Sequence, residues 1–145
     1  RDAKLLVWMG GNQAAVDTVL ALSSIAETWD DLHDGDKPVS AERLNKAFTL
    51  ALIKLQLNDF YKANEALFFA LTVTAINAWL DANDLQKSSS VDERMLAYHI
   101  RNFGVELFLL AVCRSTGWDN MRSVSLEIRR FFAHETFAAW EFRNG

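Results

Sequence analysis

The sequence predicts an all-α protein, and two observations support this fold class. Apolar residues recur at three- and four-residue spacing over long stretches, and no stretch alternates polar and apolar residues for long enough to favour a strand. Proline occurs once, at Pro38, and glycine occurs six times, so few residues would interrupt a helix. With 145 residues, of which 50% are hydrophobic, the chain can bury one sizeable core. We expect residues 1–145 to form a single-domain bundle of about five helices.

The first helix is expected over residues 12–33, where a continuous apolar stripe runs along one face. Gly35 and Pro38 follow this stripe and should end the helix. Ser40 is a good N-cap residue and should open the second helix. That helix is expected to continue to the polar break at residues 58–59.

Three further helices are expected in the rest of the chain. Residues 61–85 are apolar almost all round, which predicts a central position in the bundle. Ser90 and Glu93 have the spacing of a capping box and should start the fourth helix, which ends at Gly117. The fifth helix is expected over residues 119–142, with its first residue as the cap.

Acidic residues are concentrated near the end of the first expected helix, at Glu27, Asp30, Asp31, Asp34 and Asp36, with Lys37 as the one nearby cation. The C-terminal end of a helix already carries partial negative charge, so carboxylates there are unfavourable unless something compensates them. The compensation can be a bound cation, a nearby arginine or lysine, or solvation. Helical spacing places Glu27, Asp30 and Asp34 on one face, where a cation could bind.

A second polar set on the fifth expected helix has a similar property. Asp119, Ser123 and Glu127 are separated by four residues each, which places them on one helical face. Oxygen ligands of this kind suit hard cations such as Mg²⁺, whose shell is often completed by substrate phosphates. Each set alone is therefore compatible with a divalent metal.

Together the two sets resemble the metal motifs of class I isoprenoid synthases. That family binds Mg²⁺ between an aspartate-rich DDxxD helix and a facing helix on which Asn or Asp, Ser or Thr, and Glu follow at four-residue intervals. The resemblance implies a Mg²⁺ site formed by Asp30, Asp31, Asp34, Asp119, Ser123 and Glu127. In such a site Arg122, Arg129 or Arg130 would bind phosphate oxygens.

The chain departs from this family in three respects. It has less than half of the usual length, Asn120 stands where the second motif usually has aspartate, and no paired arginines follow the first motif. A related alternative is a small all-α nucleotide pyrophosphatase. In that case Glu27, Asp30 and Asp31 would form one acidic box, with Asp81 and Asp84 as the second.

Composition argues against several other functions. The net charge is -4, the pI is near 5.3, and there is no block of lysine and arginine, so nucleic-acid binding is not expected. No stretch approaches roughly 18 uninterrupted apolar residues, so no membrane association is expected. Cys113 is the single cysteine and cannot form an intramolecular disulfide, which favours a cytoplasmic location. Because the sequence begins at Arg1, native N-terminal residues or a targeting segment remain an open question.

The last expected helix is rich in aromatic residues, including Trp118, Phe132 and Trp140, with arginines nearby. These aromatics are too many for one narrow buried stripe, and aromatic residues and arginine are enriched at protein interfaces. We expect these three residues to contact a second copy of the chain or another protein. Packing within the monomer core is the alternative.

The segments Trp29-Asp30-Asp31-Leu32 and Asp36-Lys37-Pro38-Val39-Ser40 resemble small uncharacterised helical proteins of tailed bacteriophages. This resemblance implies no particular activity, and the sequence assigns no catalytic residue. The favoured function is a non-catalytic helical interaction or assembly protein that self-associates. The alternative is a Mg²⁺-dependent, diphosphate-binding enzyme.

Overall fold

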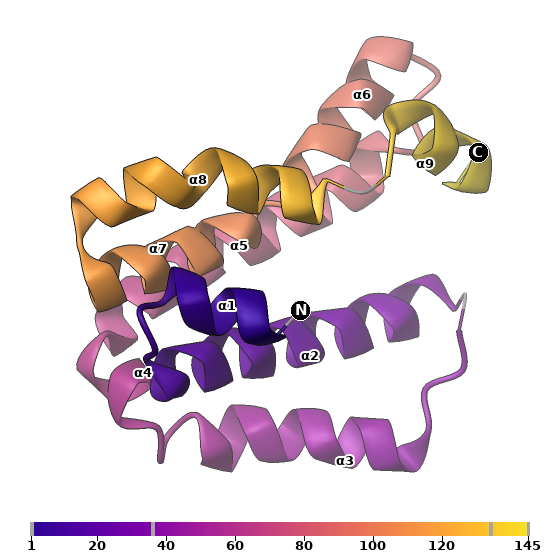
Figure 1. Ribbon diagram of the computed structural model, residues 1–145. Helices are drawn as coiled ribbons and strands as arrows, with labels where there is room; N and C mark the ends of the chain where they lie inside the picture. Colours follow the sequence, from indigo (N-terminus) through magenta and orange to yellow (C-terminus); the bar gives the residue numbers. More distant parts are fainter. Residues whose placement is uncertain (1, 36, 134, 145) are drawn as a thin grey trace. The chain divides into compact units, whose positions relative to one another are not determined.

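A computed structural model describes residues 2–35, 37–133 and 135–144 of the protein. The regular elements in these residues are all helical, which confirms the all-α fold class (Figure 1). The contacts divide the chain into two compact units. Unit 1 contains Arg1–Glu65 and Arg114–Thr116, and unit 2 contains Ala66–Cys113 and Gly117–Gly145. Each unit is described by itself.

Unit 1 is built around the long helix α2. Its elements are α1 (Asp2–Trp8), α2 (Gln13–Asp34), α3 (Ala41–Thr49), the π-helical turn η1 (Leu50–Lys54) and α4 (Asp59–Ala63). Helices α1, α3 and α4 and the turn η1 all contact α2. Helix α3 runs back alongside α2 in the opposite direction (Figure 1). The short helix α1 was not expected from the sequence.

Side-chain caps explain where the helices of unit 1 begin. The Asn12 side chain accepts a hydrogen bond from the Ala15 amide at 3.1 Å, and the Ser40 hydroxyl accepts one from the Arg43 amide at 3.1 Å. Each bond satisfies an amide that has no partner within the helix. Gly35 ends α2 in the left-handed region, with φ of 69°. The predicted limits of the first helix and the start of the second are therefore confirmed.

The polar side chain of Asn58 connects two helices of unit 1. Its oxygen caps α4 by accepting from the Tyr61 amide at 2.9 Å, while its nitrogen donates to the carbonyl of Ala14 in α2 at 2.9 Å. The beginning of α4 is thereby fixed against α2. The side chains of unit 1 that are most deeply buried are apolar apart from one threonine: Leu5, Met9, Ala15, Val16, Thr18 and Val19.

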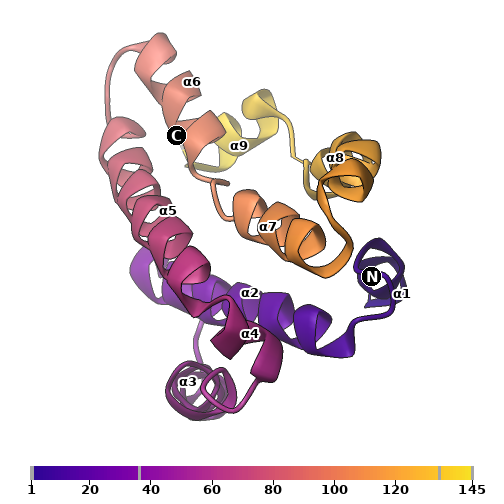
Figure 2. The ribbon, with the colours of Figure 1, turned by 90° about the vertical axis from the view of Figure 1, so that its left-hand side faces the viewer.

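The remaining helices lie almost wholly in unit 2. They are α5 (Glu65–Leu85), α6 (Val91–Ile100), α7 (Val105–Thr116), α8 (Trp118–Phe132) and α9 (Phe137–Asn144). Helices α7 and α8 form an antiparallel hairpin (Figure 1). The C-terminal helix α9 contacts α6 and lies beside it (Figure 2).

The expected fourth helix is divided into α6 and α7. Between them the backbone bonds span three residues instead of four: the Val105 amide donates to Asn102 at 3.1 Å, and the Glu106 amide donates to Phe103 at 3.0 Å. Asn102 and Gly104 are poor helix formers, which explains why the tighter turn occurs here.

The expected fifth helix is also divided, into α8 and α9. The hydroxyl of Thr136 accepts a hydrogen bond from the Ala139 amide at 3.1 Å and so opens a new helix. This local bond competes with a continuous helix. The expected third helix is also interrupted, at Asn64. The side chain of this residue donates to the Phe60 carbonyl at the end of α4. The prediction of about five helices is therefore too low.

Helix α5 does not take the central, buried position that its composition predicts. Only Phe68 and Ala82 are buried along it, whereas Phe69 is 68% exposed, Val73 50% and Leu80 47%. Judged by length and composition alone, two stretches of the described residues could cross a membrane. They are Glu65–Leu85, with mean hydropathy 1.2, and Val91–Thr116, with mean hydropathy 1.3.

Candidate functional site

The acidic end of α2 is compensated in part by an arginine from the neighbouring helix. Arg43 of α3 donates from Nη2 to Oδ2 of Asp31 at 3.0 Å. Asp34 lies 3.1 Å from the imidazole nitrogen Nδ1 of His33. Asp30 is partly buried, and Asp34 is exposed. Three ways of offsetting the negative charge at this end of the helix were considered from the sequence. For Asp31 the structure shows one of them, a nearby arginine.

The second predicted metal set lies on α8. Asp119, Ser123 and Glu127 are all exposed. The hydroxyl of Ser123 donates to the Asn120 carbonyl at 2.8 Å, which is a local bond within the helix. The three residues occupy a solvent-facing side of α8, as their four-residue spacing predicts.

The two predicted metal sets belong to different units: the aspartates of α2 lie in unit 1, and α8 lies in unit 2. Within the described part of the chain, no three histidine, cysteine, aspartate or glutamate side chains are grouped as a metal ion would require. The Mg²⁺ site remains a prediction from the sequence.

The three arginines predicted to bind phosphate lie on α8 and differ in their surroundings. Arg129 forms an ion pair with Glu106 of α7, with 2.7 Å between Nη1 and Oε1. Both side chains of this pair are substantially exposed, so its contribution to stability is small. Arg122 and Arg130 are exposed on α8.

Titration calorimetry with Mg²⁺ and inorganic diphosphate tests the predicted metal chemistry directly. If the predicted site forms, diphosphate should bind with saturable heat only in the presence of Mg²⁺, and Asp30→Asn should abolish this coupled binding. The absence of coupled binding in the wild type would contradict the predicted site. Glu42→Gln, at an exposed acid of α3, is the matched control.

The three predicted interface aromatics occupy different environments. Trp118, the first residue of α8, is 64% exposed. Phe132 is half-buried and packs on Phe108 with 4.6 Å between the ring centroids. Trp140 is only 4% exposed and lies in a core cluster with Ala82 and Ala97. The structure therefore places Trp140 in the interior of unit 2, which is the packing alternative, and Trp118 is the only one of the three that is exposed.

A polar cluster holds α9 against α6 around this core. The Tyr98 hydroxyl donates to the Glu135 carbonyl, and the Arg101 guanidinium lies over the rings of Tyr98 and Trp140 at 4.7 and 5.5 Å. Burial lowers the pKa of Arg101, and the nearby carboxylate of Glu135 opposes this shift. An ion pair also joins Nε of Arg94 to Oε1 of Glu141 at 2.6 Å. The role of these contacts is structural, because they hold the C-terminal helix α9 in place.

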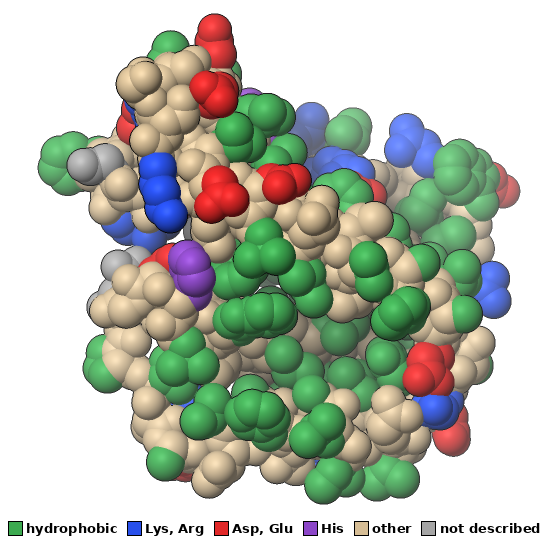
Figure 3. All heavy atoms as spheres, turned by 180° about the vertical axis from the view of Figure 1, so that it is seen from behind, with side chains coloured by type: hydrophobic (Ala, Val, Ile, Leu, Met, Phe, Trp, Pro, Cys, Tyr) green, Lys and Arg blue, Asp and Glu red, His purple; other side chains and the backbone are tan. Residues whose placement is uncertain are grey.

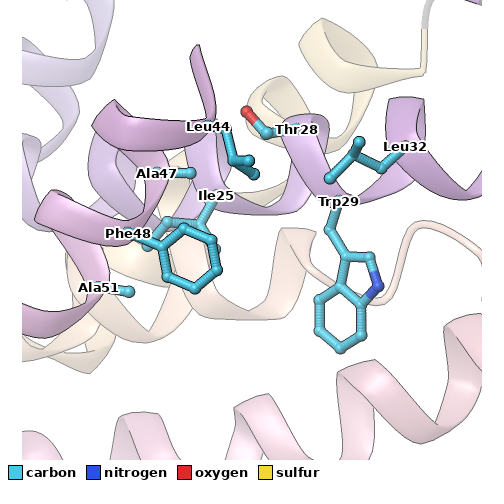
Figure 4. Close-up of a pocket in the computed structure, with 8 residues that line it drawn as sticks. All are labelled: Ile25, Thr28, Trp29, Leu32, Leu44, Ala47, Phe48 and Ala51. Carbon is cyan, nitrogen blue, oxygen red and sulfur yellow. The ribbon is translucent and has the colours of Figure 1, made fainter. Parts of the chain in front are cut away.

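An apolar groove of about 270 Å³ lies between α2 and α3 in unit 1 (Figure 4). Helix α2 contributes Ile25, Thr28, Trp29 and Leu32. Helix α3 and the first part of η1 contribute Leu44, Ala47, Phe48 and Ala51. Both sets follow the spacing i, i+3, i+4 and i+7, which places each on one helical face. The groove has no charged residue in its lining.

The accessibility of the groove differs between its floor and its edges. Thr28 and Ala47 are buried, whereas Trp29 is 45% exposed and Phe48 is 57% exposed. Figure 4 shows the rings of Phe48 and Trp29 on opposite sides of the hollow. The sequence did show the apolar stripe of the first helix, but an apolar stripe usually indicates core packing. Spacing alone therefore could not reveal that its edge stays open.

Comparisons with protein-family models, with curated proteins and with solved structures find no match to this chain.

Proposed function

We propose that this chain is a non-catalytic helical assembly protein that associates with copies of itself. The observation that carries the proposal is the exposure of large apolar side chains in both units. In unit 1, Leu52 is 69% exposed and Leu57 is 74% exposed, and in unit 2 Phe69 is 68% exposed. Hydrophobic side chains cover much of the face drawn in Figure 3.

Exposed apolar surface of this extent favours association. Single exposed hydrophobic residues are normal on soluble proteins, but contiguous apolar patches larger than a few hundred Å² mark interaction sites. On α5, Phe69, Val73 and Leu80 follow one another at four and seven residues, so they lie along one side of the helix. Burying such surface removes it from water at roughly 25 cal/mol per Å².

The other functional expectations from the sequence have less support than self-association. A catalytic role in Mg²⁺ and diphosphate chemistry has no comparable observation in its favour. The absence of nucleic-acid and membrane partners, the cytoplasmic location and a phage origin stay predictions from the sequence. Because two stretches have the length and composition of membrane spans, the experiments must include a membrane readout.

Light scattering coupled to gel filtration tests self-association. The chain has a mass of 16.4 kDa, and we expect a mass of twice this value or more that falls on dilution. The midpoint of urea unfolding should rise with protein concentration, because association stabilises only the folded chain. A mass of 16.4 kDa at every concentration, with a constant midpoint, would contradict the proposal. Co-sedimentation with neutral lipid vesicles would instead show that a membrane covers the apolar surface.

A further inference from the structure

We infer that the groove between α2 and α3 is the self-association surface, and that its occupant is the same face of a second copy of this chain. This inference rests on the proposed function and names the surface and the partner. The face consists of the groove, with its exposed lining residues Trp29, Leu32 and Phe48, and of Leu52, which is exposed and follows Phe48 after about one helical turn. We call it the α2–α3 face.

The size of the groove favours a side chain as its occupant. Pockets for drug-sized ligands and cofactors usually enclose about 300–1,000 Å³ and surround most of the ligand. This groove measures about 270 Å³ and is lined by residues of α2, α3 and the turn η1. Its lining contains the Thr28 hydroxyl and the Trp29 indole nitrogen but no charged group with which to orient a polar ligand. An apolar side chain from another protein surface meets these conditions.

The shape of the α2–α3 face is compatible with pairing to itself. The face carries a hollow and, at its edge, the protruding ring of Phe48, which is 57% exposed (Figure 4). In a twofold dimer each surface patch meets an identical patch, so that residue i contacts j and j contacts i. A ring from each copy can then fill the hollow of the other.

The charge of the face also favours a second copy. The whole chain has a net charge of -4, so contacts between two copies generally bring like charges together. The eight residues that line the groove are uncharged, and so is Leu52. The ion pair between Arg43 and Asp31 involves residues outside this lining. The apolar centre of the α2–α3 face therefore carries no charge that would repel the same groove of a second copy.

The exposed apolar area agrees with what a stable dimer needs. A standard interface buries about 800 Å² per partner, and about 56–58% of this area is apolar, which corresponds to roughly 450 Å². From their exposed fractions, the four exposed residues of the α2–α3 face offer on the order of 450 Å² of side-chain surface. The outer side of α5 has fewer large side chains: Phe69, Val73 and Leu80, with exposures of 68%, 50% and 47%. These three side chains therefore expose less surface than the four of the α2–α3 face.

Three matched aspartate substitutions test the inference in the full-length chain. Phe48→Asp places a charge in the α2–α3 face, while Phe69→Asp and Phe142→Asp make the same change on α5 and α9, where the phenylalanines are 68% and 92% exposed. We expect Phe48→Asp to weaken self-association by about 30-fold or more, as for an interface hot spot. The two control variants should retain the wild-type dissociation constant. Circular dichroism checks that each variant remains helical.

A second variant keeps the test decisive if Phe48→Asp fails to fold. Leu52→Asp changes a side chain that is 69% exposed at the same face, and it should also give a monomer. If the wild type is a dimer and neither variant weakens it, or if only Phe69→Asp or Phe142→Asp does, the inference is wrong while the proposed function stands. A wild type that is monomeric at all concentrations overturns the proposed function itself. Vesicle binding that Phe48→Asp abolishes would show that the face docks on lipid, and would overturn the inference.

Discussion

Replacing Phe68 with alanine is expected to lower the free energy of unfolding by about 3–5 kcal/mol. Phe68 is completely buried and is the largest fully buried side chain among the described residues. Its truncation removes the apolar contacts of a phenyl ring and leaves a cavity that the surrounding helices can close only in part. Urea unfolding followed by circular dichroism measures the change.

The neighbouring residue provides a matched control for this experiment. Phe69 lies on the same helix, α5, but is 68% exposed. Phe69→Ala makes the same change in helix propensity without opening a cavity, so it should alter stability by less than about 1 kcal/mol. Both variants are compared at low protein concentration, where association contributes least. Equal effects of the two substitutions would show that α5 is oriented differently from the structure.

Trp140→Ala is expected to cost about 3–5 kcal/mol and to release the C-terminal helix α9. Trp140 is 4% exposed and packs with Ala82 and Ala97. It also supports the ring of Tyr98, with 5.7 Å between the centroids, and the guanidinium of Arg101. A helix of eight residues is not stable in water without tertiary contacts. The loss of this one side chain should therefore free the whole helix.

Amide hydrogen exchange distinguishes the release of α9 from a general loss of stability. In Trp140→Ala the amides of α9 should exchange rapidly, while those of α7 keep most of their protection. Phe142→Ala is the control on the same helix, because Phe142 is 92% exposed, and it should leave the exchange of α9 unchanged. Rapid exchange of α9 in the wild type would contradict the packing of Trp140.

The sequence was sufficient where a side chain caps the backbone locally. Asn12 and Ser40 begin helices within one residue of the predicted starts, and Ser90 caps α6 as expected, with the Glu93 amide 3.4 Å from its hydroxyl. The reciprocal half of that capping box is replaced, since the Glu93 carboxylate accepts from Ser88 at 2.8 Å. Such bonds involve residues only a few positions apart, so spacing is enough to predict them.

The breaks within the long apolar stretches were harder to predict. The interruptions at Asn64, Gly104 and Thr136 involve residues that are tolerated inside many helices, and their effect depends on the local hydrogen bonds that they make. Apolar periodicity continues across each break, so the expected helices were too few and too long. Periodicity reports which residues avoid water, but not where the backbone bonds change.

The candidate sites show the same limit. The spacing of Asp30 and Asp34 placed carboxylates together, but it could not show that Arg43, from another helix, would bind the intervening Asp31. The apolar spacing of α2 was visible as well, yet whether Trp29 is covered depends on the packing of α3 beside it. Contacts between different helices therefore determine the surroundings of Asp31 and the exposure of Trp29.

The turn η1 carries one residue more than a continuous α-helix would need. Here the Leu55 amide donates to the Leu50 carbonyl at 3.0 Å, five residues back, so this turn accommodates one residue more than an α-helical turn. Deleting one residue within η1 would restore the ordinary helical turn and leave the following side chains near their present directions. Leu55, only 4% exposed, would then keep its place in the interior. The same deletion in the α-helical part of α3 would rotate the following side chains by about 100° and should be tolerated far less.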